Sequence, residues 1–385
     1  MSHQANDQLP FCLPPDISPK VFLAEYWQKK PLLIKNGLPA LAGMFEPTDV
    51  LDLAIEDGVS ARLITQKDED PSQWTLKSSP LTESDLQKTP TLWTVLVQNL
   101  EQWSPELGEL WQAFDFIPKW QQDDIMVSVA QAGGSVGMHY DEYDVFLAQG
   151  YGSRRWQLGK MCEVGTPFVE GQPIRLLDDM GQIIFDEVLK AGDVLYVPPR
   201  LSHYGLAVDD CLTFSFGFRR PNMVQVLDEL ADVATGEHEL FSPMILPQDL
   251  QDNPYELSDE SVSAIKDKLI DLLNSDKGNA ILTQALSELV SKRQYDLVAF
   301  DDEQSPDELG ERLQNGECLM INPACRFVLQ NGQWYINGES VCFDDKESSL
   351  IEQFTSGDAI IFDDLDDELL SSCATWLNDN WLILI

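Results

Sequence analysis

The chain has 385 residues, with 65 acidic and 25 basic side chains and a formal charge of −40. A surface this acidic repels phosphate backbones, so direct nucleic-acid binding is disfavoured and a basic protein or peptide is the better partner. On charge alone, solubility or adaptation to salty or cold surroundings explains the excess equally well. The sequence contains no apolar run of about eighteen residues and no leader-like start at residues 1–15, so we expect no membrane span, no secretory signal and a cytoplasmic location.

The length of the chain and its cysteines indicate how many domains to expect and whether disulfides or zinc support them. A chain of 385 residues is too long for one ordinary core, which predicts two or three domains. The seven cysteines are scattered and never spaced as Cys-x-x-Cys, so a disulfide framework or zinc ribbon is not indicated. We expect reduced, mostly buried cysteines.

The first segment mixes short helices and strands. Ser18-Pro19 offers a cap and a first-turn proline, and aromatic and apolar residues then recur four apart, which predicts a helix over 18–30. The apolar triplet 32–34 predicts a short buried strand. A helix over 46–56 and a strand over 61–66 follow.

From residue 124 onward, short apolar strands alternate with glycine turns and no helix intervenes. The expected strands cover 125–131, 138–141, 145–149, 154–158, 192–197 and 212–218. This spacing predicts an antiparallel barrel or double-sheet jelly roll whose mouth can hold a small ligand and a metal.

Beyond Pro221 the pattern changes to helical periodicity. Apolar residues share one helical face within 223–234, 262–272 and 282–289, which predicts an α-helical domain over 221–297. Packing of a simple bundle and dimerisation are both compatible with these faces. Residues 298–385 then combine helices over 305–315 and 366–377 with strands over 318–321, 326–330 and 334–336, which predicts a small winged-helix-like α+β domain. Its many acidic residues favour protein contacts over DNA binding.

Two of the four histidines stand in a pattern typical of metal ligands. His139 and Asp141 are two residues apart after a glycine-rich turn, so on a strand they point to one face. His203 follows a turn, a strand and two prolines that can present it at a barrel mouth. Two histidines and one carboxylate, with other positions open, are the ligands of non-haem Fe(II) oxygenases. His3 lies near the terminus and His238 in an acidic, exposed context, so neither is a candidate.

A pair of arginines begins the next predicted strand. By strand parity Arg154 and Arg155 point to opposite faces, so only one of them can face the barrel interior; alternatively, both are surface charges. A guanidinium inside a barrel needs a carboxylate partner, which a dicarboxylate cosubstrate would supply. Ser128, on a preceding strand, could add a hydroxyl hydrogen bond to the same carboxylate.

The run from His139 to Trp156, the Pro198-Pro199…His203 stretch and the segment 216–222 together closely resemble the bacterial ribosomal oxygenases of the JmjC (cupin) class. The resemblance implies a mainly β double-stranded β-helix catalytic domain over 1–220, a helical dimerisation domain over 221–297 and a winged-helix-like domain over 298–385. It also implies a homodimer.

The activity that this resemblance implies is Fe(II)-, 2-oxoglutarate- and O2-dependent 3-hydroxylation of an arginine in the sixteenth protein of the large ribosomal subunit. Transferred position by position, His139, Asp141 and His203 hold the metal and Arg154 binds the distal carboxylate of 2-oxoglutarate. Ala130 departs from the family, which often has serine there, so Ser128 and Thr213 are the candidates for the hydroxyl contact. Glu142 or Asp144 would guide the guanidinium of the substrate.

Two other functions stay open at this point. One is a JmjC oxygenase that acts on a different basic protein. The other is a non-catalytic cupin that binds basic ribosomal proteins during assembly.

Overall fold

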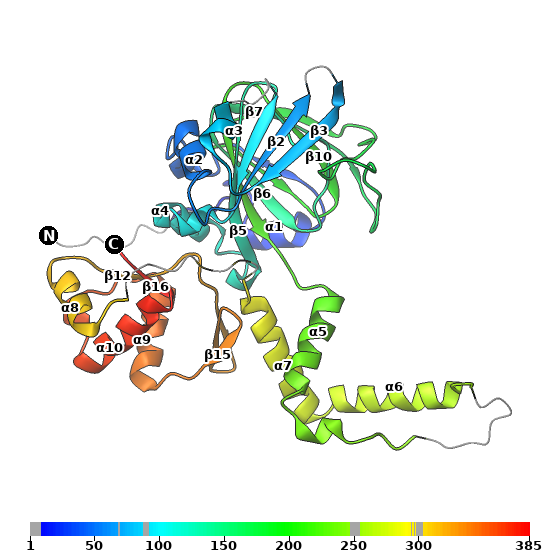
Figure 1. Cartoon of the computed structure of the whole chain (residues 1–385), viewed down its shortest axis with the longest axis vertical. Helices are drawn as coiled ribbons and strands as arrows, with labels where there is room; N and C mark the ends of the chain where they lie inside the picture. The colour runs from blue at the N-terminus through cyan, green and yellow to red at the C-terminus, as the bar shows by residue number, and fades with distance from the viewer. Residues whose placement is uncertain are drawn as a thin grey trace.

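The computed structural model describes residues 9–67, 70–87, 92–246, 255–293, 295, 297 and 303–385. A β-rich barrel lies above a helical arm and a compact C-terminal domain in Figure 1. No helix among these residues is both long and apolar enough to cross a bilayer. All seven cysteines are free and four of them are buried, as the sequence predicted.

The barrel consists of two facing antiparallel sheets, which confirms the predicted jelly roll. The larger sheet has the strand order β1-β9-β6-β11-β5-β4-β2-β3. Its strands are, in that order, β1 (Leu32–Ile34), β9 (Val194–Val197), β6 (Asp144–Tyr151), β11 (Cys211–Phe218), β5 (Gln122–Ala130), β4 (Trp93–Val97), β2 (Ala61–Lys67) and β3 (Asp70–Ser78). The smaller sheet is β10 (Leu201–Ala207), β7 (Ser153–Met161) and β8 (Phe185–Lys190).

The two faces of the larger sheet bury different kinds of side chain. On β11, Phe214, Phe216 and Phe218 belong to the main core, which packs against the N-terminal helices. Because strand side chains alternate, Cys211, Thr213 and Ser215 face the barrel interior instead. A second apolar cluster fills one end of that interior between the sheets. The polar positions of the inward face are therefore the ones available to a ligand.

Short helices cover the outer face of the larger sheet. They are α1 (Pro19–Glu25), η1 (Pro39–Leu41), α2 (Pro47–Leu53), α3 (Glu83–Gln87), η2 (Leu100–Gln102), α4 (Pro105–Gly108), η3 (Glu109–Phe114) and η4 (Lys119–Gln121). Helix α1 begins as predicted, with the Ser18 hydroxyl accepting from the Val21 amide at 3.3 Å. It ends earlier than residue 30 because Gln28 takes a φ of 62° and donates its amide to the Tyr196 hydroxyl at 2.7 Å.

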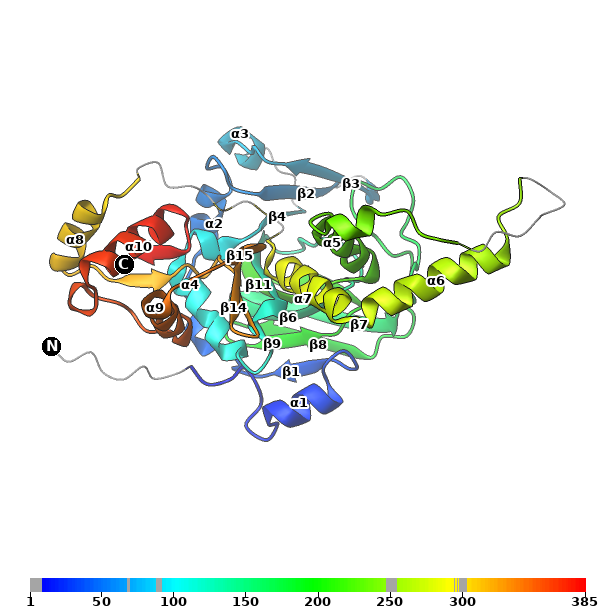
Figure 2. The same ribbon diagram turned by 90° about the horizontal axis from the view of Figure 1, so that it is seen from below.

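A helical arm follows the barrel. It comprises α5 (Met223–Ala234), η5 (His238–Phe241), α6 (Asp259–Leu273) and α7 (Asp276–Ser291). Helix α6 projects away from the rest of the molecule in Figure 2 and buries none of its residues. Helix α7 packs on α5 and also contacts β13 and β14 of the C-terminal domain.

The C-terminal domain has its own apolar core around Leu319, Ile351 and Trp376. Its elements are α8 (Pro306–Gln314), β12 (Leu319–Ile321), β13 (Phe327–Gln330), β14 (Gln333–Ile336), β15 (Glu339–Val341), α9 (Asp345–Ser356), η6 (Phe362–Asp364), α10 (Asp367–Asn378) and β16 (Leu382–Leu384). The predicted domain boundary at 297/298 adjoins residues outside the described part of the chain.

Candidate metal centre and cosubstrate site

The two candidate histidines are joined by a pair of backbone hydrogen bonds. The His139 amide donates to the His203 carbonyl at 3.1 Å, and the His203 amide donates back at 2.8 Å. His203 lies on β10, whereas His139 forms only this isolated bridge. The strand predicted over 138–141 is therefore wrong in extent, because its end residues Met138 and Asp141 accept from the amides of Leu177 and Arg200, which lie outside the strands.

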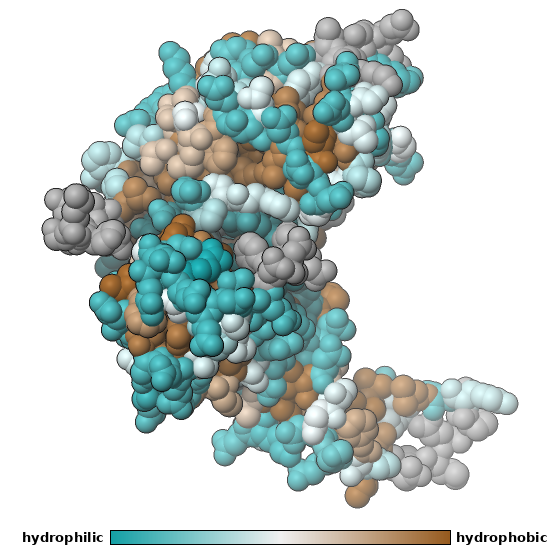
Figure 3. All heavy atoms as spheres, turned by 60° about the vertical axis from the view of Figure 1, so that its left-hand side comes forward, coloured by the Kyte–Doolittle hydropathy of each residue, from teal (hydrophilic) through white to brown (hydrophobic). Residues whose placement is uncertain are grey.

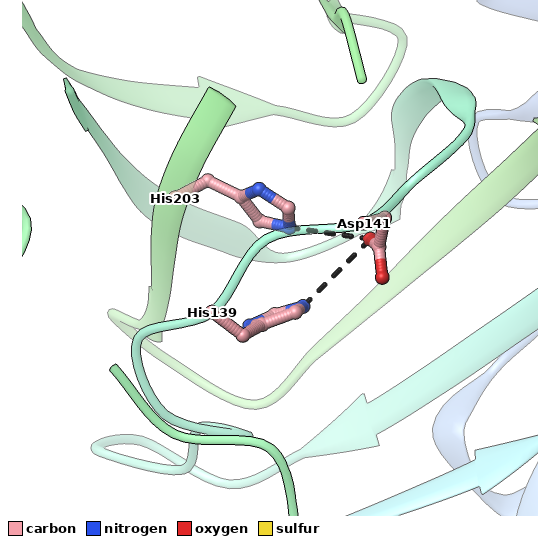
Figure 4. A group of neighbouring side chains, drawn as sticks. All are labelled: His139, Asp141 and His203. Atoms are coloured by element: carbon pink, nitrogen blue, oxygen red, sulfur yellow. Dashed lines mark ion pairs between the residues drawn. The ribbon is translucent and has the colours of Figure 1, made fainter. Parts of the chain in front are cut away.

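Their side chains converge with that of Asp141 (Figure 4). One ligand atom from each of the three residues lies within 4.8 Å of the other two. The Nε2 atoms of His139 and His203 are 3.9 and 3.6 Å from Oδ2 of Asp141. Each Nδ1 atom instead lies at hydrogen-bond distance from a carbonyl, at 3.0 Å from Gly137 and 2.9 Å from Leu201. These contacts orient both Nε2 atoms toward one point, as in protein metal centres.

Burial keeps the more enclosed histidine neutral. His203 is 2% exposed, and desolvation followed by the nearby His139 lowers its pKa to about 4. A neutral imidazole offers the lone pair that a divalent metal needs. Two imidazole nitrogens and one carboxylate on one side of a point fit Fe(II) with open positions opposite.

The glycine turn before His139 has a steric reason. Gly137 takes a φ of 83°, and a Cβ there would come within 2.1 Å of Leu176. Only glycine satisfies both demands at once. The Gly137 carbonyl oxygen lies at hydrogen-bond distance from Nδ1 of the His139 ring, so the turn sets the orientation of a candidate ligand.

Arg154 points into the barrel and Arg155 points out. Arg155 makes a two-pronged pair with Asp186 at the surface, at 2.6 and 2.5 Å. Arg154 is 1% exposed, and its guanidinium reaches only the Cys211 sulfur at 3.8 Å. Its Nε has no hydrogen-bond partner and no carboxylate pairs with it among the described residues. A buried unpaired guanidinium is costly, so its surroundings fit an anionic ligand.

The two candidate hydroxyls lie side by side on neighbouring strands. Ser128 and Thr213 are register partners of β5 and β11. The Ser128 hydroxyl donates to the Thr213 carbonyl at 3.3 Å, whereas the Thr213 hydroxyl donates to Gln149 at 2.8 Å. Ala130 packs instead with Ala207 and Cys211, next to Arg154.

Three further residues near the metal centre were not singled out by the sequence. Asp124 shares the inward face of β5 with Ser128, is 7% exposed, and has an Oδ2 without a hydrogen-bond partner. Burial, then Asp123 and Glu101, raise its pKa to about 7. Tyr143 follows Asp141 by two residues, and Arg219 lies over its ring at 4.7 Å. Strand alternation on β5 is the one signal that could have indicated Asp124.

The structure also separates the two suggested substrate guides. Glu142 is exposed near the centre. Asp144 is fully buried on the outer face, where it accepts the Tyr196 hydroxyl at 2.5 Å and where burial raises its pKa to about 6. Asp144 therefore cannot contact a substrate, and that expectation is wrong.

One cavity, of about 340 Å³, lies elsewhere. It is a partly open pocket between the barrel and the C-terminal domain, with Trp111, Asp123, Arg326 and Trp334 among its walls. None of the three candidate ligands lines it.

Two family models match the chain. A JmjC domain matches residues 109–226 and a ROXA-like winged helix matches 271–383. A probable ribosomal oxygenase of Haemophilus influenzae is 45% identical over 97% of this chain and 98% of its own length. The chain belongs to the JmjC ribosomal oxygenases.

Further similarities indicate which reaction and which ligands accompany this fold. The ribosomal protein uL16 3-hydroxylase of Escherichia coli is 30% identical over 83% of this chain and 84% of its own length. The structure of YcfD, a ribosomal oxygenase from Escherichia coli, in complex with cobalt and 2-oxoglutarate superposes with a TM-score of 0.79. It is 26% identical and covers 96% of this chain and 98% of that chain. A metal and 2-oxoglutarate are thus bound in a relative with this fold.

Proposed function

We propose that the chain is an Fe(II)- and 2-oxoglutarate-dependent hydroxylase that converts an arginine of uL16 to 3-hydroxyarginine, acting in the cytoplasm. The observation that carries the proposal is the convergence of His139, Asp141 and His203 beside the buried, unpaired Arg154. The naming of a similar protein as a uL16 3-hydroxylase supports the choice of substrate.

In this assignment His139, Asp141 and His203 hold the metal, and Arg154 pairs with the distal carboxylate of 2-oxoglutarate. When bound, Fe(II) couples oxidative decarboxylation of 2-oxoglutarate by O2 to insertion of one oxygen atom into a substrate C–H bond, with succinate and CO2 as coproducts. The Ser128 hydroxyl is the better candidate to assist Arg154, because its hydrogen bond to the Thr213 carbonyl is long, at 3.3 Å, whereas Thr213 donates to Gln149 at 2.8 Å.

The protein itself positions the reactants and limits the access of water. The apolar cluster around Leu147, Trp156 and Leu195 closes one end of the barrel. Asp124, with its unpartnered oxygen on the inward face, offers a carboxylate to the substrate guanidinium. A basic ribosomal loop also suits a chain with a charge of −40.

We further propose a homodimer formed through the helical arm. Apolar side chains gather on the projecting arm in Figure 3. On α6, Val262, Leu269 and Ile270 are 44 to 55% exposed, and on α5 Met223 and Val224 exceed that. An exposed apolar face of this extent is typical of an interface between copies.

The test is mass spectrometry of recombinant uL16 after incubation with the protein, Fe(II), 2-oxoglutarate and O2. We expect a gain of one oxygen atom, placed on an arginine by fragmentation. The His139→Ala variant should give no product while still binding uL16. If uL16 stays unmodified while another basic protein is modified, the chain is a JmjC oxygenase with a different substrate. If uL16 stays unmodified but binds the wild type and the variant equally well, the chain is a non-catalytic cupin.

A further inference from the structure

Three carboxylates are buried together at the end of the barrel nearest the C-terminal domain. Glu101 is 2% exposed, Asp123 5% and Asp124 7%. They lie close enough that the charges of Asp123 and Glu101 both act on Asp124. Several buried acidic groups at one place are costly unless cations accompany them.

Most of the compensating cations come from outside the barrel. Arg293, just after α7, reaches Glu101 at 3.3 Å. Arg326, just before β13 of the C-terminal domain, contacts the carboxylate of Asp123 at 2.9 Å and its carbonyl at 3.0 Å. The barrel itself supplies Arg219, which pairs with the other oxygen of Asp123. The catalytic domain therefore depends on later parts of the chain for its charge balance.

Arg219 links Asp123 to Tyr143, which lies close in sequence to the candidate metal ligand Asp141. Its amide is anchored on the Gln121 carbonyl at 2.8 Å, and its guanidinium lies between Asp123 and the ring of Tyr143. A cation over an aromatic face holds the ring in place. Tyr143 is two residues from Asp141, so the position of this ring bears on the segment that presents the carboxylate ligand.

We propose that Arg326 of the C-terminal domain is a positioning residue for catalysis: by holding Asp123 it fixes Arg219 against Tyr143, and so fixes the segment that carries Asp141. The inference rests on the proposed function for its kinetic consequence. It assigns the C-terminal domain a part in completing the active site, in addition to any role in contacting partners. Packed side chains and ion pairs that touch in sequence can carry coupling between distant sites, and Arg326, Asp123, Arg219 and Tyr143 form such a series.

The experiment compares full-length Arg326→Gln, Arg326→Lys and Arg312→Gln. Arg312 lies in the same domain and makes an exposed pair with Glu317 at 2.6 Å, so its loss controls for removal of a charge. Three quantities are measured: KM and kcat for a uL16 peptide, the affinity for Co(II) by visible absorption with 2-oxoglutarate present, and Tm. We expect Arg326→Gln to raise KM at least five-fold and to weaken Co(II) binding at least three-fold. Arg326→Lys should restore most of both, and Arg312→Gln should match wild type.

A second variant separates positioning from simple support of the fold. Asp123→Asn should reproduce the Arg326→Gln effects, and the double variant should be no worse than the more severe single variant. A lower Tm of Arg326→Gln with unchanged KM and unchanged Co(II) affinity would overturn the proposal. So would a double variant whose fold-changes in KM and Co(II) affinity equal the product of those of the two single variants. If wild type fails to oxidise uL16, the proposed function fails, and the Co(II) affinities still decide the positioning role.

Discussion

Arg154 shows how one buried residue defines a ligand. Its guanidinium is 1% exposed and has only the Cys211 sulfur as a polar neighbour among the described residues. Arg155, next in sequence, is already paired with Asp186 at the surface. The two arginines therefore form a matched pair for mutagenesis, one facing each side of β7.

Replacing Arg154 by glutamine should raise the KM for 2-oxoglutarate about 30-fold. Removing one partner of a buried charge pair costs at least ~2 kcal/mol, and 1.4 kcal/mol is a factor of ten. Arg155→Gln should leave this KM within about two-fold of wild type, since exposed pairs contribute little. Succinate release at varied 2-oxoglutarate measures both, and equal KM values for the two variants would contradict the assignment.

If Asp124 binds the substrate guanidinium, as we propose, substrate binding depends on pH. Burial raises its pKa to about 7, so the carboxyl is neutral below that pH and charged above it. Because the neutral form is favoured in the folded protein, this group stabilises the fold at low pH and that contribution is lost as pH rises toward 7. Recognition of a guanidinium has the opposite dependence, since it needs the charged form.

We therefore expect KM for the uL16 peptide to fall about tenfold between about pH 6 and pH 8. Asp124→Asn should have a higher KM that no longer varies over this range. Peptide kinetics at saturating 2-oxoglutarate give the profile, and a wild-type KM independent of pH would exclude Asp124 from the guanidinium site.

At the scale of elements, periodicity predicted the regular strands and missed the irregular ones. The strands over 125–131 and 212–218 were found within a few residues, because both faces of each strand are mostly buried and the outer face is a regular series of apolar residues. The strands β3, β4, β8, β10, β15 and β16 and the helices α3, α4 and α9 were not predicted. β8 (Phe185–Lys190) is mostly exposed, so its polar residues carry little strand signal.

The candidate site was more predictable than the elements around it. His139, Asp141 and His203 could be named because the chemistry requires those residue types at close spacing. Strand parity showed only that no more than one of Arg154 and Arg155 can face the interior, and the choice of Arg154 came from the resemblance to the ribosomal oxygenases. Strand alternation could have placed Asp124 on the inward face, but its role and those of Tyr143 and Arg219 could not be found, since they depend on contacts between β5, β11 and the segment after His139. Tertiary contacts of that kind leave no period in the sequence.

At the scale of the whole molecule, the helical arm predicts an assembly. Helix α6 buries no residue in one copy, and a stable homodimer needs on the order of 2,000 Å² of buried surface. Leu269→Asp, on the apolar face, should convert the dimer to a monomer at micromolar concentration. Lys268→Asp, which places the same charge off that face, should stay dimeric. Sedimentation equilibrium distinguishes them, and a monomeric wild type would refute the arm as an interface.

The end of α7 contacts both α5 and the C-terminal domain. The Lys292 ammonium is paired with Glu229 of α5, while its carbonyl accepts from Arg326 at 3.1 Å. The Ser291 hydroxyl, one residue earlier, accepts from the amide of Gly338 at 3.1 Å. A shortened gene that stops at residue 220 would leave Glu101 without its guanidinium partner, and one that starts at 298 would strip the anchor from Gly338. Anyone dividing this protein for NMR or for fusion to another enzyme should therefore keep α7 and the C-terminal domain on the same piece as the barrel.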